Sequence, residues 1–543
     1  MILFKRVLRI IFSEQAWLPL LFLILYIALP TRMHYSDGLD SAYFLERPDF
    51  GLEGFHPHHP FFLPLMRFMY RIASGFFPEL RAITFLAAIS AISGALGILL
   101  FMRLLKTWGE TSFSSACGGI ILGSSFAYWR YSSDADAYIP SLAISLWSLY
   151  IVFSRKNGIT NSRAVASGFI LALAVLLHQL SLFIAIAFFY FLLLYPDKLK
   201  LRLKSSIVLV VTFIAIIFVS VLVNYFVFLQ NMGENIGKYF YYLTSYAHDR
   251  YFSTFLNESL VQIVSESARS HAHLFIHLRP PEVIFYTRYR GDTLTSLLFY
   301  RLFTAVCVLI VLLVLLLIQR EDKIRLHIFR MNFIWLALVF IFTTCFMPEN
   351  HFYKIFYLPP FIYISGEFAR RIIRILKFNL KPVVAVALAV YFIYVLMSGI
   401  IPDHNPKSNP FYYYTERLDR IVSKNDLVIL PSDKRYLVKF YRYFGKGEVL
   451  RATSRIAYTD YWSEIWPNRF EFASKTEEFF KSRFENILIS ERAWSQGEEF
   501  LMFSRYNFPG FQPIVLMLEK EHLIVEEKVM GYDGQYLKVR IEE

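Results

Sequence analysis

Long apolar runs, separated by short clusters of charge, recur along most of this chain and leave few folds open to it. A backbone that crosses the hydrocarbon core of a bilayer must close its own hydrogen bonds, so each run is expected to be a helix. The composition agrees, because 56% of the 543 residues are hydrophobic, only 18% are charged and the mean hydropathy is +0.43. A wholly soluble protein is excluded, and the pattern predicts a polytopic α-helical membrane protein.

Taken at the length that a bilayer crossing requires, the runs predict about eleven transmembrane helices. The first follows Lys5, Arg6 and Arg9 as in a signal sequence, but no small-x-small cleavage site follows it, so an uncleaved span is expected. The pair 164–178 and 180–195 fits two spans, one hairpin or a re-entrant feature. The predicted spans lie near residues 16–31, 82–102, 116–129, 137–153, 164–178, 180–195, 206–230, 298–318, 331–347, 353–368 and 382–401.

Loop charge gives these spans an orientation. With the N-terminus in the cytoplasm, the cytoplasmic loops are rich in Lys and Arg, as in 198–204 and 370–377, while the short loops opposite hold few, such as Arg130 and Lys354. The positive-inside rule then predicts a protein integral to the plasma (inner) membrane with an extracytoplasmic C-terminus, periplasmic in a Gram-negative cell. The net charge of +13 is interpreted as topogenic charge near anionic lipid, not as nucleic-acid binding.

A change in character after Pro402 predicts two domains. Residues 1–402 form a multi-span module with long outer loops at 32–81 and 231–297, and residues 403–543 form an extracytoplasmic α/β domain. Within the second domain, short β-rich runs alternate with helix-like stretches. The expected strands are 427–430, 448–450, 487–489, 522–529 and 536–541, and the expected helices lie near 411–423, 434–444 and 475–484.

The first outer loop carries an amphipathic stripe and a histidine cluster. Apolar residues at helical spacing between Leu65 and Phe76, with Arg67 and Arg71 four apart, predict a helix in the membrane interface. His56, His58 and His59 lack a Cys or carboxylate at metal-ligand spacing, so hydrogen bonding to a phosphate or sugar is preferred to a zinc site.

Carboxylates stand in two outer segments. Asp37 and Asp40 follow the first span, where a partly desolvated carboxylate can act as a general base, but Asp and Gly are also common in solvated turns. Asp134 and Asp136 stand beside Arg130 before the fourth span, where they can orient a sugar, hold a divalent cation or cap the next helix. The two interpretations of the first pair and the three of the second stay open.

Two further outer positions carry polar groups between apolar runs. His178 interrupts the pair of spans discussed above, as a core residue or a substrate contact. His351, Tyr353 and Lys354 begin the next-to-last span, where a lysine can pair with a phosphate or extend to the headgroups. By the loop-charge orientation all these groups share the extracytoplasmic side, as an active site at the outer membrane surface requires.

These residues give the chain a resemblance to a known family. The segment from Asp37 to His56-Pro57 and Pro60–Leu65, the loop Tyr128–Tyr138, the break His178-Gln179-Leu180 and the segment His351–Pro360 resemble those of the GT-C superfamily of integral-membrane glycosyltransferases, near the bacterial protein O-mannosyltransferase and aminoarabinose transferase branch. The histidine cluster departs from that pattern. The C-terminal domain carries no motif that names an acceptor.

The resemblance implies an inverting glycosyltransferase of cell-envelope glycan biosynthesis that moves a sugar from a polyprenyl-phosphate-linked donor to an extracytoplasmic acceptor. It implies Asp37 as general base, with Asp40 as the competing choice, and Arg130 and Lys354 as ligands of the lipid phosphate. Whether a divalent cation takes part stays open. The remaining implied substrate contacts are Asp134, Asp136, His56, His58, His59, Arg67, His178, His351 and Tyr353.

Two other functions compete with transfer. A transporter or flippase for a lipid-linked or small polar substrate would be expected to show matched halves with broken helices near the midplane, and no such symmetry is found in the sequence. A membrane scaffold with a partner-binding C-terminal domain would not need the acidic and basic loop residues. Replacing Asp37 with Asn separates the enzyme from both alternatives.

Overall fold

The computed structural model divides into two compact units, each described by itself. The first comprises Met1–Thr31 and Gly54–His404, and the second comprises Arg32–Glu53 and Asn405–Glu543. Of the sequence predictions, His56, the span 298–318 and the helix near 475–484 lie outside the described residues. The structure describes residues 16–34, 36–47, 58–154, 160–194, 199–226, 236–237, 260–277, 323–346, 348, 350–376, 380–430, 435–453, 484, 486–495, 499–504, 514–519, 523–530 and 535–541.

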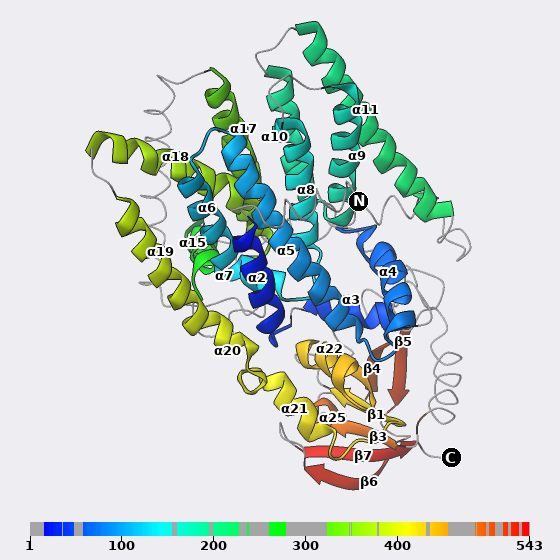
Figure 1. Ribbon diagram of the computed structural model, residues 1–543. Coiled ribbons are helices and arrows are strands. Elements are labelled where there is room, and N and C mark those ends of the chain that lie inside the picture. Colours follow the sequence, from blue (N-terminus) through cyan, green and yellow to red (C-terminus); the bar gives the residue numbers. More distant parts are fainter. Residues whose placement is uncertain are drawn as a thin grey trace. The chain divides into compact units, whose positions relative to one another are not determined.

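Helices make up the described part of the first unit, and every predicted span within that part falls on at least one of them (Figure 1). The helices are α2 (Trp17–Ala28), α4 (Phe62–Phe76), α5 (Ala82–Thr107), α6 (Ser112–Ser124), α7 (Phe126–Ser132), α8 (Tyr138–Phe153), α9 (Asn161–Leu177), α10 (Ser181–Leu194), α11 (Leu199–Asn224), α15 (Leu260–Phe275), α17 (Lys323–Cys345), the 3₁₀ helix η5 (Tyr353–Tyr357), α18 (Leu358–Leu376), α19 (Lys381–Val395), the π-helix η6 (Leu396–Ile400) and α20 (Ile401–His404).

Length and composition make some of these helices fit to cross a bilayer. Among the described residues, four helical stretches qualify: Ala82–Thr107, Leu203–Asn224, Ile324–Cys345 and Lys381–His404. Apolar side chains on the outer faces of α2, α11 and α19 are exposed, among them Ile24, Phe218 and Val390. Exposed apolar faces of this size suit contact with lipid rather than water. The total of about eleven spans stays a prediction.

One expected helix is two. The sequence predicts a single span at 116–129, but the helix ends at Ser124 and α7 begins at Phe126. Ser124 and Ser125 donate their hydroxyl hydrogens to the carbonyls of Ile120 and Ile121, and Ser125 has an extended ψ of 127°. Such back-bonding bends a helix, and a non-helical residue ends it. The short α7 that follows is buried along its whole length.

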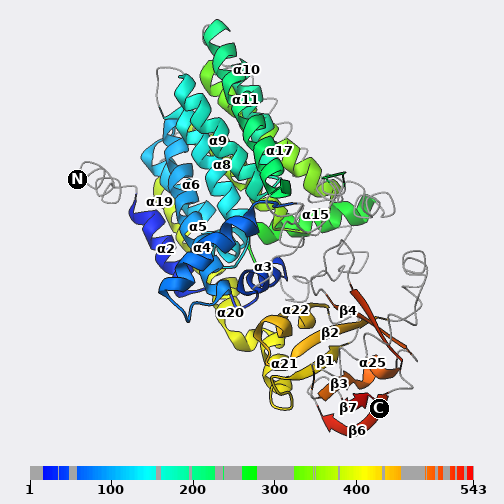
Figure 2. The same ribbon diagram turned by 90° about the vertical axis from the view of Figure 1, so that its right-hand side faces the viewer.

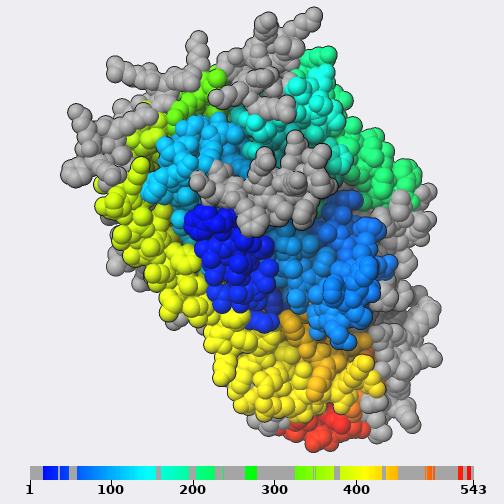
Figure 3. All heavy atoms as spheres, in the orientation of Figure 1, coloured from blue at the N-terminus to red at the C-terminus, as the bar shows by residue number. Residues whose placement is uncertain are grey.

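Small and hydroxylated residues let the helices approach closely. Neighbouring helices pack in the order α5, α8, α9 and α11, and the same row is visible in both ribbon views (Figures 1 and 2). Ser141 and Ser145 of α8 hydrogen-bond Ser181 of α10 at 2.7 and 2.9 Å, and Ser148 bonds Ser167 of α9 at 2.7 Å. On the face drawn in Figure 3, α2 (dark blue) lies beside α5, with which it is packed. Close packing of small residues and hydrogen bonds between hydroxyl groups are typical of helices in a membrane, where no hydrophobic effect drives helices together.

The amphipathic stripe of the first outer loop is helix α4. Phe68, Ile72 and Phe76 are exposed along one side, as expected of a helix in the membrane interface. The two arginines of this helix do not share an environment, since Arg67 is buried and Arg71 is exposed. Only Arg67 is therefore enclosed by the protein.

The second unit is built on a seven-stranded sheet in the order β5-β4-β2-β1-β3-β7-β6, in which β1 pairs in parallel with β2 and β3 and the outer pairs are antiparallel. The strands are β1 (Asp426–Leu430), β2 (Glu448–Thr453), β3 (Asn486–Ser490), β4 (Glu499–Ser504), β5 (Ile514–Glu519), β6 (Leu523–Met530) and β7 (Gln535–Ile541). All five predicted strands are present. The sequence prediction missed β4 and β5, which pair with each other and extend the β2 edge.

Both faces of the central strand are covered. Leu427 and Ile429 belong to one apolar cluster, and Val428 and Leu430 belong to a second on the other face, as expected for a parallel strand buried on both sides. Helix α25 (Glu491–Ser495) packs over β3 and β7, and α22 (Arg435–Phe444) packs over β2. Helix α21 (Pro410–Leu418) lies against α22, and Asn409 caps it by accepting from the Phe411 amide.

A segment from the first outer loop also belongs to this unit. Residues Ser36–Glu46 form helix α3, which packs against α22. The expected alternative of a solvated turn at Asp37 is wrong, because Asp37 lies in the first turn of this helix. A carboxylate there is favoured by the positive end of the helix dipole.

Candidate functional site

Buried polar residues of the first unit gather where α7, α9, α15 and η5 end or begin. Arg130 lies in the last turn of α7 and is 1% exposed, and Lys354 lies in η5 and is 0% exposed. Lys and Arg are rarely buried unless paired, so two such residues require an explanation beyond packing.

Arg130 has an acidic partner that the sequence prediction did not identify. Its guanidinium NH1 lies 3.7 Å from Oδ2 of Asp403, and both side chains are buried. Asp403 belongs to α20, in the helical unit, rather than to the C-terminal domain that was predicted to begin there. A carboxylate at the end of an apolar span was the signal available in the sequence.

Asp134 and Asp136 follow Arg130 in the loop before α8, and both are buried. Asp134 Oδ1 accepts from the Ala135 amide at 2.8 Å, and Asp136 Oδ1 accepts from the Ala137 amide at 2.6 Å. The predicted capping of the next helix is not observed, because the N-cap of α8 is Ala137 and no side chain makes a cap hydrogen bond there. The hydroxyl of Ser90 donates to the Asp136 carbonyl, which ties the loop to α5.

Lys354 is held by oxygen atoms from two other segments. Its Nζ donates to the Ser270 hydroxyl on α15 and, at 2.5 Å, to the carbonyl of Pro348. The backbone N–H of Lys354 donates to the carbonyl of His351, which begins the turn of η5. The expected interpretation of a lysine reaching toward the headgroups is therefore wrong, since this ammonium group is enclosed.

Backbone hydrogen bonds bring the first histidine cluster to the break at His178. The Gln179 amide donates to the carbonyl of His58 at 2.8 Å, and the Phe61 amide donates to that of Leu176. The ring of His178 lies 6.1 Å from that of His59 and 6.3 Å from that of His58, measured between ring centroids. The sequence predicted these histidines as separate contacts, and the structure brings them together.

His178 presents a hydrogen-bond donor. Its Nδ1 accepts from the Leu180 amide at 3.2 Å, which assigns the proton of the neutral ring to Nε2. Within the part of the chain that the structure describes, Nε2 is buried with no hydrogen-bond partner. A buried donor of this kind is costly unless something else accepts from it.

A second histidine group lies on α15 and before η5. The ring of His273 is 4.5 Å from that of His351 and 5.6 Å from that of His277. Burial, followed by the charges of His273, Arg130 and Lys354, lowers the pKa of His351 well below its ordinary value. Both cations therefore impose a positive potential on this imidazole, which is neutral at pH 7.

Aromatic rings join the two histidine groups. The Tyr138 ring lies 4.8 Å from His178 and 5.6 Å from Tyr131, and Tyr131 lies 5.8 Å from His351. Tyr138 also stacks on Phe352 and packs edge-on against Tyr353. The row of rings from His59 to His273 thus runs past the two tyrosines, and rings of this kind offer apolar faces with polar edges.

Burial keeps the first group neutral as well. It lowers the pKa of His58 to about 4, and burial together with the nearby His58 lowers that of His59 to about 3. Burial and the other two histidines lower the pKa of His178 well below its ordinary value. Among the described residues, no group of three or more His, Cys, Asp or Glu side chains has the arrangement of a metal site.

The two predicted base candidates lie in the other unit, on α3. Asp40 is ion-paired through Oδ2 with Nζ of Lys439 at 2.5 Å, whereas Asp37 lies one turn earlier in the helix. The side chains of the first unit that the structure brings together are those of His58, His59, Arg130, Tyr131, Tyr138, His178, His273, His277, His351, Tyr353 and Lys354.

Comparison with known proteins identifies the fold. A crystal structure of ArnT from Cupriavidus metallidurans bound to undecaprenyl phosphate matches with a TM-score of 0.52 at 10% identity, over 97% of this chain and 98% of that one. A structure of the same protein in the apo state gives a TM-score of 0.48 at 11% identity, over 88% and 92% of the two chains. No family model and no curated protein sequence matches.

The chain therefore has a fold similar to that of ArnT. The match covers the helical unit and the C-terminal sheet alike, because it spans nearly the whole of both chains. The resemblance to the O-mannosyltransferase branch stays a prediction.

Proposed function

We propose that this protein is an integral-membrane glycosyltransferase of the inner membrane that takes a sugar from a polyprenyl-phosphate-linked donor. Transfer to the acceptor takes place on the extracytoplasmic side, where the C-terminal unit also lies. The proposal is supported by an ArnT-like fold, by helices fit to span a bilayer and by buried cations near unprotonated histidines.

One observation carries the proposal: Arg130 and Lys354 are both buried and both lie close to His351. The ring of Tyr131, the residue after Arg130, lies 5.8 Å from that of His351, and the Lys354 amide donates to the His351 carbonyl. Burying a cation costs on the order of several kcal/mol, and Asp403, 3.7 Å from Arg130, offsets that cost in part. A phosphate monoester or diester would add a second anion beside the two cations. The ArnT structure with the same fold holds undecaprenyl phosphate, which is a lipid phosphate of this kind.

The reaction proceeds by displacement with inversion. The carboxylate of Asp37 takes the proton from the acceptor hydroxyl, and the acceptor oxygen bonds to the anomeric carbon as the bond from that carbon to the phosphate oxygen breaks. The electron pair of that bond leaves with the polyprenyl phosphate. Arg130 and Lys354 stabilise the charge that develops on the leaving phosphate, and this stabilisation lowers the barrier.

The histidine and tyrosine rings are proposed to bind the sugar. His178 offers its Nε2–H to a hydroxyl, and the faces of Tyr138 and Phe352 suit stacking against a pyranose or furanose ring. His58, His59, Arg67 and Tyr353 complete the donor contacts in this scheme. Asp134 and Asp136, each with one oxygen held by the backbone, orient the sugar or Arg130.

The test is release of undecaprenyl phosphate from a panel of undecaprenyl-phosphate-linked pentoses and hexoses, with a membrane extract as acceptor source. The purified full-length protein in lipid nanodiscs is expected to release it from at least one donor, and Asp37→Asn to release at least about a hundredfold less. Unchanged release by Asp37→Asn would overturn the base assignment. The same assay with EDTA decides whether a divalent cation takes part.

The transporter alternative is tested with the same lipids. If proteoliposomes move a lipid-linked sugar from one leaflet to the other and no acceptor is glycosylated, the protein is a flippase and the transferase proposal fails. A scaffold would do neither, and substitution of Arg130 or Lys354 would then leave both readouts at background.

A further inference from the structure

Helix α3, which carries Asp37, is fastened along one face of α22 in the C-terminal unit. Nζ of Lys439 lies 2.5 Å from Oδ2 of Asp40, and the Tyr443 hydroxyl donates to Oε1 of Glu46 at 2.7 Å. Lys439 and Tyr443 are four residues apart and so share a face of their helix. The two bonds hold α3 near its middle and at its end.

Three more contacts secure the segment on either side of these bonds. The Asn409 side-chain amide donates to the Arg32 carbonyl at 2.7 Å, and the ring of His34 stacks on Phe444 at 5.8 Å. The guanidinium of Arg442 lies over the ring of Tyr43. These contacts, from residue 32 to residue 46, run to α22 or to the turn before α21.

The Lys439–Asp40 pair is largely enclosed. The Lys439 side chain is 7% exposed and that of Asp40 is 17% exposed. Surface ion pairs contribute little, but a largely buried pair fixes geometry, because removing one partner leaves an uncompensated charge. Its loss is expected to release α3 rather than merely weaken it.

The other face of α22 is anchored in the sheet. Leu437, Val438 and Tyr441 belong to the apolar cluster that includes Val428 and Val449 of the central strands. Since α22 is packed between this cluster and α3, the position of α3 within the unit follows from the fold of the sheet.

We propose that the C-terminal unit holds the catalytic helix α3 in position, with Lys439 as a positioning residue for Asp37. The inference rests on the proposed function, in which Asp37 is the base. It also assigns the two candidate carboxylates different roles: Asp40 anchors α3 through Lys439, and Asp37 performs the proton transfer. A role for the C-terminal domain follows that needs no acceptor-binding motif.

The test compares full-length Lys439→Met with Lys439→Arg in nanodiscs. For Lys439→Met, turnover is expected to fall at least about tenfold with unchanged affinity for undecaprenyl phosphate, since small misplacements of a base are costly. Hydrogen exchange of the α3 amides is expected to rise while that of β1 stays slow. Lys439→Arg restores most of the turnover, and Lys424→Met, the same change at an exposed lysine, has no effect.

The outcomes separate the two proposals. If hydrogen exchange of the α3 amides and turnover are both unchanged in Lys439→Met, the C-terminal unit does not position α3 through Lys439 and the proposal is wrong. Faster exchange in both α3 and β1 also overturns it, because Lys439 would then support the whole unit. The milder Tyr443→Phe variant gives the same comparison if Lys439→Met does not fold. Faster α3 exchange combined with full activity of Asp37→Asn overturns the catalytic role of α3 and leaves its anchoring intact.

Discussion

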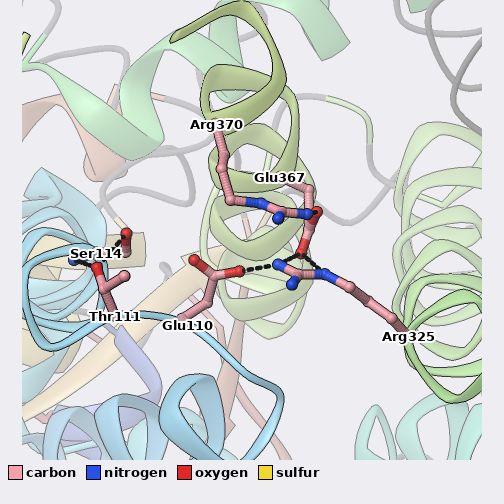
Figure 4. Close-up of polar contacts among 6 residues, drawn as sticks. All are labelled: Glu110, Thr111, Ser114, Arg325, Glu367 and Arg370. Carbon is pink, nitrogen blue, oxygen red and sulfur yellow. Dashed lines mark hydrogen bonds and ion pairs between the residues drawn. The ribbon is translucent and has the colours of Figure 1, made fainter. Parts of the chain in front are cut away.

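Two charge clusters of the first unit are built differently. The inner cluster consists of Glu110, Arg325, Glu367 and Arg370 (Figure 4), and the outer cluster consists of Arg130, Lys354 and the histidines around them. Glu110 precedes α6 and Arg130 ends α7, while Lys354 precedes α18 and Glu367 lies well along it. The same elements thus connect both clusters.

The inner cluster is closed on itself. Arg325 donates through Nε to Glu367 Oε1 at 2.8 Å and through NH2 to Glu110 Oε1 at 2.5 Å, and Arg370 donates to Glu367 Oε2 at 2.5 Å. Burial favours a higher pKa for the Glu367 carboxyl, but the hydrogen bonds and charges of Arg325 and Arg370 outweigh it and hold that pKa below its ordinary value. Two acids balance two bases, as in a structural clamp.

The outer cluster is not closed in this way. Arg130 and Asp403 stand at 3.7 Å, longer than a hydrogen bond, and the bonds of Lys354 run to a hydroxyl and a carbonyl. Positive potential reaches neutral histidines there. Charges that pair as acid and base within one cluster serve stability, and the proposed function assigns the cations of the outer cluster to a phosphate ligand. Substitutions in the two clusters test that difference.

The largest effect is expected at Lys354. Lys354→Met removes a charge aimed at the leaving phosphate and should lower turnover by about a hundredfold or more, as loss of one oxyanion donor does. Release of undecaprenyl phosphate measures it, with Lys424→Met as the matched control. If Lys354→Met is fully active and only less stable, the outer cluster has a structural role like that of the inner cluster.

The next effect is expected at Arg325 and concerns stability. Arg325→Met leaves Glu110 and Glu367 facing each other in a partly buried site, at a cost of roughly 3 kcal/mol. Thermal unfolding followed by tryptophan fluorescence should show it, with affinity for undecaprenyl phosphate unchanged in the surviving folded protein. A loss of lipid binding without loss of stability would assign the inner cluster a ligand role.

Acid should act on the outer cluster first. The pKa of His59 is about 3 in the folded protein and near 6.5 when unfolded, so the unfolded chain binds an extra proton below pH 6.5. The free energy of unfolding therefore falls as pH drops, by about 2 kcal/mol between pH 7 and pH 5 for this group. Unfolding at the two pH values, compared with His59→Gln, measures it.

The inner cluster responds at lower pH. Because the pKa of Glu367 is lowered in the folded protein, its stabilising contribution is present above its ordinary value of 4.5 and is lost only as pH falls through the folded pKa. Glu367→Gln, which removes the titrating carboxyl and keeps both arginines, should therefore leave the loss of stability between pH 7 and pH 5 unchanged. A changed slope in that interval would couple the two clusters.

The smallest effect is expected at Glu110. Burial, together with the nearby Glu367, raises the pKa of the Glu110 carboxyl, so its surroundings disfavour the charge. Glu110→Gln keeps the hydrogen-bonding shape and should change the free energy of unfolding by less than about 1 kcal/mol. A loss as large as that of Arg325→Met would show that Arg325 depends on both acids equally.

Hydropathy and its period along the chain were enough to predict most of the secondary structure. The length of the apolar runs located most helices of the first unit, and short β-rich runs located five strands, because both signals are local. The sequence did not place Asp40 against Lys439 or Arg130 against Asp403, which are far apart in the chain. It also left the histidines at 58, 59 and 178 as separate contacts, because the backbone bonds that join them depend on tertiary packing.

The serine pairs between α8, α9 and α10 bear on how the protein enters the membrane. A helix that enters lipid alone carries its hydroxyls without partners from its neighbours, and Ser181 finds its partners on α8, which is made earlier. Ser167 of α9 likewise bonds Ser148 of α8. Helix α8 thus supplies hydroxyl partners to both helices that follow it in the chain, and Ser148→Ala is expected to remove the hydroxyl–hydroxyl bond to Ser167.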